Sequence, residues 1–214
     1  MKLEIKICGI TNIEDARSAL ELEVDYLGFI FYAKSPRAVT VEQVHRIMGE
    51  LDQPCRAVGV FVNSPRADVE RVVQRCGLWA AQIHGDEDAA EFAGCSLRLW
   101  RALKMLPTGA APAPDAWAAE RYVVDAAVPG AYGGTGVTAD WEQAREEAQQ
   151  RPVILAGGLK PSNVAAALRA VAPRGLDVSS GIELMPGIKD HAKMTNFVAR
   201  AREVAAGGDV YEEE

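Results

Sequence analysis

LEIKICGITNIEDA, from Leu3 to Ala16, contains one complete copy of the unit that repeats along this chain. Its first part, Leu3–Cys8, is a short apolar run of the kind that forms a buried strand. Its second part opens with Thr11-Asn12-Ile13-Glu14, which reads as a capping box, where a hydroxyl and a carboxylate satisfy the first free N–H groups of a helix. The stretch therefore predicts a strand followed closely by a helix, the βα unit of a parallel sheet.

The same alternation continues to the end of the chain. A second capping box, Thr40-Val41-Glu42-Gln43, opens the helix after the second apolar run. Eight βα repeats predict an α/β fold, a single (β/α)₈ or TIM barrel with eight parallel strands. An open, doubly wound sheet stays an alternative, because the number of strands does not prove closure. The eight runs are LEIKIC, DYLGFIF, AVGVFV, WAAQIH, LRLWRAL, RYVVDA, PVILAG and GLDVSS.

One helix of the barrel is expected to be degenerate. Pro107, Pro112 and Pro114 fall where the fifth helix should lie, and proline disrupts a helix interior, so we expect a loop and at most a short helix there. No linker divides the chain. We therefore expect one catalytic barrel domain over residues 1–206 and a frayed acidic tail over 207–214.

Composition and charge narrow the classes of function. The chain has 214 residues, 49% of them hydrophobic and 25% charged, with a net charge of −7. An acidic protein without clustered Lys and Arg argues against nucleic acid as a partner. The four cysteines lie far apart, so neither a zinc site nor a disulfide framework is indicated. The chain starts with a strand-like segment and has no apolar run of membrane-spanning length, so we expect a cytoplasmic protein with no membrane partner.

In a barrel of this kind, active sites form at the carboxyl ends of the strands. The first run ends at Cys8. Because side chains in a strand alternate between its faces, Leu3, Ile5 and Ile7 share the helix side and Cys8 points into the barrel mouth. A thiol there can act as a base if its surroundings favour the thiolate. Taken alone, a small buried packing residue is the somewhat better interpretation.

The sixth run ends at Asp125, where a carboxyl group at the edge of a buried strand is able to deliver a proton. A strand-end aspartate is as often a helix cap or a loop anchor. Gly133-Gly134-Thr135-Gly136 follows closely and has the composition of a loop that closes over a ligand, or of a simple turn.

The ends of the seventh and eighth runs predict a phosphate site. Glycine lets backbone N–H groups approach an anion closely, and hydroxyls and a short helix N-terminus after the last strand would add donors. Two ordinary turns are the less favoured interpretation of the pair. The predicted phosphate-binding residues are Gly157, Gly158, Ser179, Ser180 and Gly181.

Two further residues lie near the predicted mouth. Arg37, in the loop after the second run, is able to bind a carboxylate through two parallel hydrogen bonds, although an isolated Arg is more commonly a solvated loop charge. His84, at the end of the fourth run, is a possible proton shuttle, but a structural histidine in the pocket wall is the commoner case.

The ordered set of motifs closely resembles the phosphoribosylanthranilate isomerase family of tryptophan biosynthesis, from about Lys2 to Arg202. Cys, where a related family has Asp at the end of strand one, makes the set specific. Val137 follows the glycine segment where many relatives carry Lys. The motifs are KICGIT (6–11), KSPR (34–37), QIHG (82–85), VD (124–125), GGTG (133–136), AGGL (156–159) and DVSSGIE (177–183).

What the resemblance implies is an isomerase that performs an Amadori rearrangement of a small phosphorylated substrate, phosphoribosylanthranilate, without a cofactor or metal. It makes Asp125 the general acid that opens the furanose ring and Cys8 the base that removes the C2′ proton. It also assigns the anthranilate carboxylate to Arg37, and an acidic position near the substrate to Asp177. A monomer and a homodimer are both compatible with it.

Three other functions stay open from the sequence. The histidine-pathway isomerase, or a bifunctional form of it, does the same chemistry but uses Asp where this chain has Cys8. A barrel lyase such as indole-glycerol-phosphate synthase relies on strand-end lysines, for which Lys104 is the plausible counterpart. A barrel that binds a phosphorylated ligand only as a sensor would retain the binding residues and lack turnover.

Overall fold

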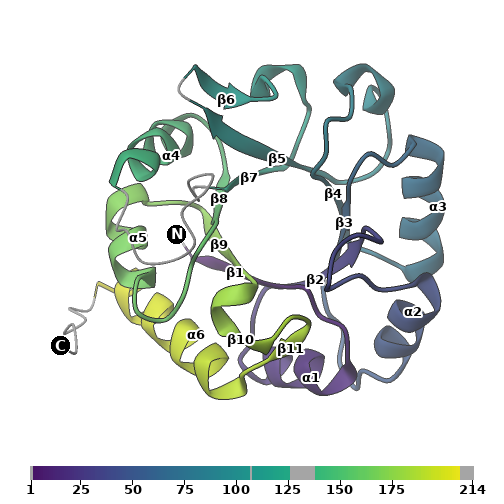
Figure 1. Ribbon diagram of the computed structural model, residues 1–214, viewed down its shortest axis with the longest axis horizontal. Coiled ribbons are helices and arrows are strands. Elements are labelled where there is room, and N and C mark those ends of the chain that lie inside the picture. Colours follow the sequence, from purple (N-terminus) through teal and green to yellow (C-terminus); the bar gives the residue numbers. More distant parts are fainter. Residues whose placement is uncertain (1, 107, 126–137, 208–214) are drawn as a thin grey trace.

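The computed structural model describes residues 2–106, 108–125 and 138–207. Eight parallel strands form a ring, which the pairing of β4 with β5 closes. Figure 1 shows this ring end-on with the helices around it. Closure confirms the predicted barrel and rules out the open, doubly wound sheet. The barrel strands are β1 (Glu4–Cys8), β2 (Tyr26–Phe31), β3 (Ala57–Phe61), β4 (Ala80–Ile83), β5 (Leu99–Leu106), β7 (Arg121–Asp125), β8 (Val153–Ala156) and β9 (Gly175–Val178).

The helices follow the strands, with two interruptions. After β5, the described residues form a short antiparallel strand, β6 (Gly109–Ala111), and one 3₁₀ turn, η2 (Pro114–Ala116), as the prolines predict. No helix in the described part of the chain is long and apolar enough to cross a membrane. The α-helices are α1 (Ile13–Glu21), α2 (Val41–Gly49), α3 (Arg66–Cys76), α4 (Thr138–Gln150), α5 (Val164–Val171) and α6 (His191–Ala205).

The connection after β4 differs from the prediction, which placed the degeneracy only at the fifth helix. Here a single 3₁₀ turn, η1 (Ala89–Phe92), replaces the fourth helix. Asp88 caps this turn by accepting from the N–H of Ala90, and Gly94, with a φ of +65°, ends the segment two residues after the turn. The segment is therefore too short to form a helix that spans the barrel.

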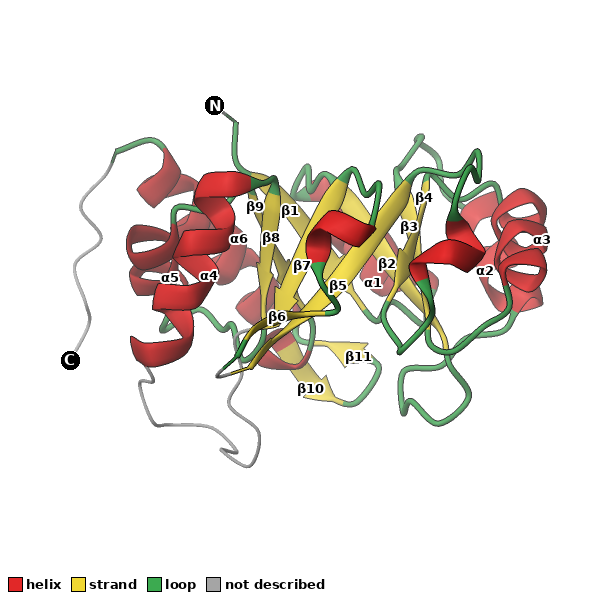
Figure 2. Ribbon diagram, turned by 90° about the horizontal axis from the view of Figure 1, so that it is seen from above, coloured by secondary structure: helices red, strands yellow, loops and turns green. Residues whose placement is uncertain are grey.

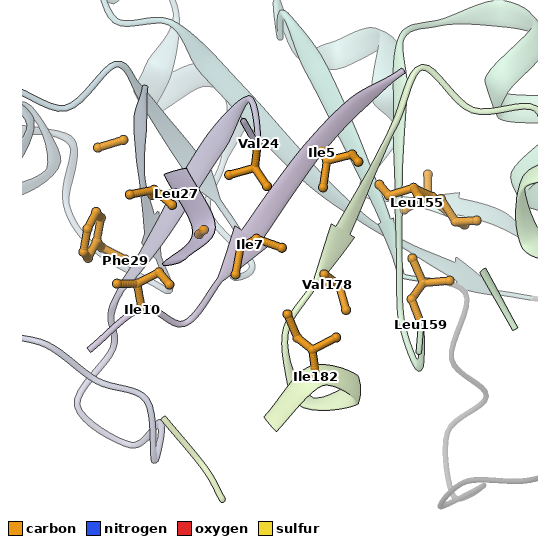
Figure 3. Packing of buried hydrophobic residues seen from close by; sticks show 14 of the residues in the cluster. Ile5, Ile7, Ile10, Val24, Leu27, Phe29, Leu155, Leu159, Val178 and Ile182 are labelled. Atoms are coloured by element: carbon orange, nitrogen blue, oxygen red, sulfur yellow. The ribbon is translucent and has the colours of Figure 1, made fainter. Parts of the chain in front are cut away.

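The two faces of the strands bury different layers. The larger apolar layer lies between strands and helices and includes Ile5 and Ile7, which Figure 3 shows with their neighbours. A second layer fills the barrel interior, where Tyr26 packs edge-on against Trp100. The alternation predicted for the first strand holds, since Ile5 and Ile7 contact the helix side and Cys8 faces inward.

One of the two predicted capping boxes is confirmed. At α2, Thr40 accepts from the N–H of Gln43, and the Gln43 side chain accepts in return from the N–H of Thr40. At α1, the prediction of Thr11 as the cap is wrong. Asn12 caps this helix by accepting from the N–H of Asp15, because the hydroxyl of Thr11 donates instead to the carbonyl of Gly187.

An additional hairpin extends from the barrel after β9. It consists of a 3₁₀ turn, η3 (Ser180–Ile182), and two short antiparallel strands, β10 (Glu183–Met185) and β11 (Ile188–Lys189). Figure 2 shows this hairpin and β6 at the same end of the barrel. Because β1 and β9 run parallel and end there, this is the end at which the predicted site residues gather.

Candidate active site

Cys8 lies at the inner end of β1 and is 7% exposed. Its neighbour across the β1–β2 pair is Gly28, and a Cβ atom added there would lie 2.8 Å from Cys8 Sγ and 2.9 Å from Lys6 Cε. The absence of a side chain on Gly28 therefore makes room for Lys6 and Cys8 to lie together against β2. Lys6 and Cys8 share the inward face because they are two residues apart in a strand.

Lys6 is a buried cation that the sequence analysis did not identify as a site residue. Its Nζ donates to Asp177 Oδ2 at 2.9 Å, on the neighbouring strand β9, and to Gln82 Oε1 at 3.0 Å, on β4 across the barrel interior. Burial acts to lower the pKa of Lys6, but the Asp177 carboxylate and Cys8 outweigh it and hold that pKa above its ordinary value. The signal that predicts this position is a Lys in an apolar strand, two residues before Cys8.

The protonation of Cys8 depends on opposing effects. Burial is the largest and raises the pKa of the Cys8 thiol, and the Asp177 carboxylate raises it further. Lys6 and Lys189 act in the opposite direction. The pKa of Cys8 ends above its ordinary value, which favours the thiol at neutral pH, and Lys6 lowers the free energy needed to form the thiolate.

Asp125 ends β7 and is half-buried. In the sheet it pairs in register with Lys104 of β5 and Ala156 of β8, which places it directly beside the predicted phosphate turn. It lines a cavity of 360 Å³ together with His84 and Lys104. The Gly133–Gly136 segment and Val137, which follow in sequence, lie outside the described residues. Lys104, the possible lyase residue, is exposed and pairs with Asp86 at 3.3 Å.

The predicted phosphate residues come together from β8 and β9. Gly157 and Gly158 both have positive φ, +87° and +61°, which is the conformation that favours glycine. A Cβ at Gly181 would overlap the carbonyl oxygen of Leu159, so η3 packs directly on the turn after β8. Ser179 Oγ is buried and has no hydrogen-bond partner within residues 2–106, 108–125 and 138–207.

Arg37 lies over the end of β1, where its Cδ would be 2.7 Å from a Cβ on Gly9. Arg37 binds a carboxylate, as its residue type suggests, but this carboxylate belongs to Glu183 of the same chain. Its Nε and Nη2 donate to Glu183 Oε1 and Oε2 at 2.8 and 2.6 Å. Among the hydrogen bonds of the described residues, none uses Nη1 of Arg37, so this nitrogen is left for a second acceptor.

Glu183 and Lys189 are the other polar residues that the sequence analysis did not identify. Lys189 Nζ donates to Glu183 Oε1 at 2.8 Å and to the carbonyl oxygen of Cys8 at 2.6 Å. Burial acts to raise the pKa of Glu183, but Arg37 and Lys189 together hold it below its ordinary value. The β10–β11 hairpin thus ties the Arg37 loop to the end of β1. No motif in the sequence predicts a pairing between residues so far apart.

Asp177 faces the same space as Cys8. One carboxylate oxygen, Oδ2, is engaged by Lys6, whereas Oδ1 is buried and has no partner in the part of the chain that the structure describes. A buried oxygen of this kind is normally satisfied by a hydrogen bond. The arrangement is therefore suited to an N–H or O–H donor from a ligand.

Three comparisons with known proteins agree with this geometry. Residues 5–200 match the family model described as N-(5′-phosphoribosyl)anthranilate (PRA) isomerase. The N-(5′-phosphoribosyl)anthranilate isomerase of Pseudomonas fluorescens is 45% identical over 199 residues, 92% of this chain and 97% of that one. Among solved structures, phosphoribosyl anthranilate isomerase from Thermotoga maritima has a TM-score of 0.82 at 33% identity, over 94% of this chain and 99% of that one. A phosphoribosyl anthranilate isomerase in complex with reduced 1-(o-carboxyphenylamino)-1-deoxyribulose 5-phosphate has a TM-score of 0.78 at 30% identity, over 94% and 99%.

Proposed function

The chain belongs to the N-(5′-phosphoribosyl)anthranilate isomerase family, and from this premise we propose that Cys8 and Asp125 perform its chemistry as base and acid. The protein is an isomerase of tryptophan biosynthesis. It converts N-(5′-phosphoribosyl)anthranilate to 1-(2-carboxyphenylamino)-1-deoxyribulose 5-phosphate. This Amadori rearrangement moves hydrogen within one molecule, so an acid and a base are sufficient for it.

The acid step belongs to Asp125. Its carboxyl proton goes to the furanose ring oxygen, the bond between that oxygen and C1′ breaks, and the nitrogen lone pair forms the C1′=N Schiff base. The base step belongs to Cys8, whose thiolate removes the proton from C2′ to give an enolamine. The enolamine then becomes the ketone by gaining a proton at C1′ and losing one from the C2′ hydroxyl. Cys8 and Asp125 end strands that are not adjacent in the barrel, which allows them to approach the C2′ proton and the ring oxygen of one sugar from different directions.

The charged neighbours of Cys8 support its role as a base. A buried thiol beside Asp177 alone would rarely be ionised, because burial and the Asp177 carboxylate both disfavour the thiolate. Lys6 supplies a compensating cation on the same face of β1. We infer that Lys6 is a positioning residue that makes the thiolate accessible during turnover.

The remaining groups place the substrate. The phosphate is assigned to Gly157, Gly158 and the Ser179–Gly181 segment, where two glycine turns and a serine hydroxyl converge. The anthranilate carboxylate is assigned to Arg37, through Nη1. Asp177 Oδ1 is assigned to the N–H that bridges the aromatic ring and the sugar.

The strongest support for the proposed function comes from two buried side-chain oxygens beside Cys8. Asp177 Oδ1 and Ser179 Oγ have no partner in the described part of the chain, and they lie on one strand end next to the base. Buried polar atoms without partners cost free energy unless a ligand satisfies them. A ligand with both an N–H group and a phosphate, as in this substrate, supplies what each of them lacks.

The test is a direct assay of the purified protein. Phosphoribosylanthranilate is mixed with the enzyme, and the loss of anthranilate fluorescence is followed. We expect rapid, enzyme-dependent loss with the ketose phosphate as product. A folded protein that binds the substrate without turning it over would instead support the sensor, and turnover of the histidine-pathway substrate would add a second activity.

We also propose that the enzyme acts in the cytoplasm as a monomer or a homodimer. A small phosphorylated substrate from central biosynthesis and four free cysteines are compatible with a reducing cytoplasm. Light scattering coupled to size-exclusion chromatography separates one chain of 23.0 kDa from two.

A further inference from the structure

His84, at the end of β4, makes a hydrogen bond that defines which of its ring nitrogens carries the proton. Gln82 Nε2 lies 2.9 Å from His84 Nδ1, and Gln82 Oε1 accepts from Lys6 Nζ at 3.0 Å. Gln82 and Lys6 are both 1% exposed, so neither can turn to water instead. The direction of the Lys6–Gln82 hydrogen bond therefore determines the direction of the Gln82–His84 hydrogen bond.

The series has one consistent assignment. A lysine ammonium can only donate, so the Gln82 oxygen must face it and the Gln82 NH₂ must face His84. An amide NH₂ can also only donate, so His84 Nδ1 must be the acceptor and carries no proton. The single proton of the neutral imidazole is then on Nε2. Lys6 and Gln82 thus select the Nε2–H tautomer, through a relay that starts at the ammonium of Lys6.

The neutral form of His84 is also favoured. Burial, the largest effect, lowers the pKa of His84, and Lys6 and Arg101 lower it further. Asp177 and Asp125 act in the opposite direction and are outweighed. A second proton, on Nδ1, would face the NH₂ group of Gln82, which is also a donor. The hydrogen bonds of Gln82 therefore disfavour the imidazolium as well.

Contacts with Arg101 and Asn63 hold the backbone around His84 in place. Buried Arg101 donates to the carbonyl oxygens of Ile83 and Gly85, each at 2.7 Å, one on either side of His84. Gly85 itself packs so closely on Asn63 that a Cβ there would lie 2.6 Å from the Asn63 nitrogen. His84, which is only partly buried, lines the same 360 Å³ cavity as Asp125.

We propose that His84 is a further substrate-binding residue, which presents a fixed, neutral Nε2–H donor to an oxygen of the bound sugar beside Asp125. This inference rests on the function proposed above. A neutral imidazole at this place does not compete with Asp125 as the acid, because it has no labile proton of comparable acidity to give. It binds and orients a hydroxyl, and the ring oxygen that Asp125 protonates becomes such a hydroxyl.

The tautomer is measured in the ligand-free enzyme by long-range ¹H–¹⁵N correlation NMR on ¹⁵N-histidine protein. Exposed His45 and ion-paired His191 serve as internal references, and the signals that His84→Gln removes identify His84. We expect the Nε2–H pattern between pH 6 and 8. An Nδ1–H pattern, or an imidazolium at pH 7, would overturn the relay.

Two variants of Gln82 test whether Lys6 and Gln82 select the tautomer of His84. In Gln82→Glu, the new carboxylate accepts from both Lys6 and His84, so we expect the tautomer to switch to Nδ1–H and the pKa of His84 to rise. Gln82→Met removes both contacts and should leave a mixture of tautomers, while the reference histidines stay unchanged. An unchanged Nε2–H signal in both folded variants would show that Lys6 and Gln82 do not select it.

Kinetics separate a substrate-binding role from a structural one. The terminal amide of His84→Gln reaches the position of Nε2 and keeps a donor there, whereas His84→Asn places its amide near Nδ1. We expect kcat/KM to fall roughly three- to tenfold in His84→Asn, the effect of one hydrogen bond, and to recover most of the loss in His84→Gln. Equal kcat/KM in both variants and the wild type would refute the contact, whereas an inactive wild type would refute the proposed function.

Discussion

Lys6→Met removes the cation between Cys8 and Asp177 while keeping a side chain of similar length. The ion pair that it breaks is buried, with Lys6 0% and Asp177 8% exposed in their side chains. Removing one partner of such a pair leaves an uncompensated charge, which costs about 3–5 kcal/mol of unfolding free energy. The matched control is Lys2→Met, whose pair with Asp25 is exposed on the lysine side and worth at most about 1 kcal/mol.

The stability loss should not depend on pH over the ordinary range. The folded-state pKa of Lys6 is raised, so its contribution is complete below the ordinary lysine value and is lost only as the pH rises through the folded-state pKa. Urea denaturation at pH 6 and pH 9 should therefore give the same difference between wild type and Lys6→Met. A double variant, Lys6→Met with Asp177→Asn, should recover much of the stability because no charge is left buried alone.

The kinetic effect of the same change acts through Cys8. Without Lys6 the pKa of the Cys8 thiol rises further, and because the thiolate is the active form in the proposed mechanism, the rise of kcat/KM with pH should move to higher pH. A charge-assisted hydrogen bond is worth about 1.5–3 kcal/mol, which corresponds to a loss of about 10- to 150-fold in kcat/KM at neutral pH. An unshifted pH profile in a folded Lys6→Met enzyme would refute the role of Lys6 in forming the thiolate.

Three further changes test other parts of the structure. Arg37→Ala should raise KM with little effect on kcat, because the interaction with the substrate carboxylate is the same in the ground and transition states, and an unchanged KM in steady-state assays would remove Arg37 from binding. Gly181→Ala forces its Cβ onto the Leu159 carbonyl. It should therefore raise KM for the phosphorylated substrate and lower the midpoint of thermal unfolding. Wild-type values of both quantities would show that η3 is free to move. Thr40→Ala should cost about 1 kcal/mol in urea denaturation without changing kcat, because it removes only the cap of α2, and a loss below about 0.3 kcal/mol would contradict the capping box.

Local patterns in the sequence were sufficient to predict the barrel. Alternating apolar runs and cap residues define each βα unit, and period-two alternation correctly places Cys8 on the inner face. The misassigned cap at Thr11 shows the limit of local rules. The Thr11 hydroxyl is used by the carbonyl of Gly187, which is far away in the sequence and close only in the fold.

The candidate site could be predicted where a residue ends a strand, and not where its role depends on a distant partner. Cys8 and Asp125 are visible as strand ends, and the glycine turns as departures from the apolar pattern. Lys6 looks like a polar break in a strand until Asp177 is placed beside it on β9 and Gln82 opposite it on β4. Glu183 likewise gains its meaning only when the β10–β11 hairpin brings it to Arg37.

The most direct test of the central claim is the steady-state kinetics of Cys8→Ser and Asp125→Asn with phosphoribosylanthranilate. In the proposed mechanism both residues act on groups that change in the transition state, so kcat should fall by about 10²- to 10⁴-fold in each variant while KM stays close to that of the wild type. A near-wild-type kcat in either folded variant would contradict the assignment of that residue as acid or base.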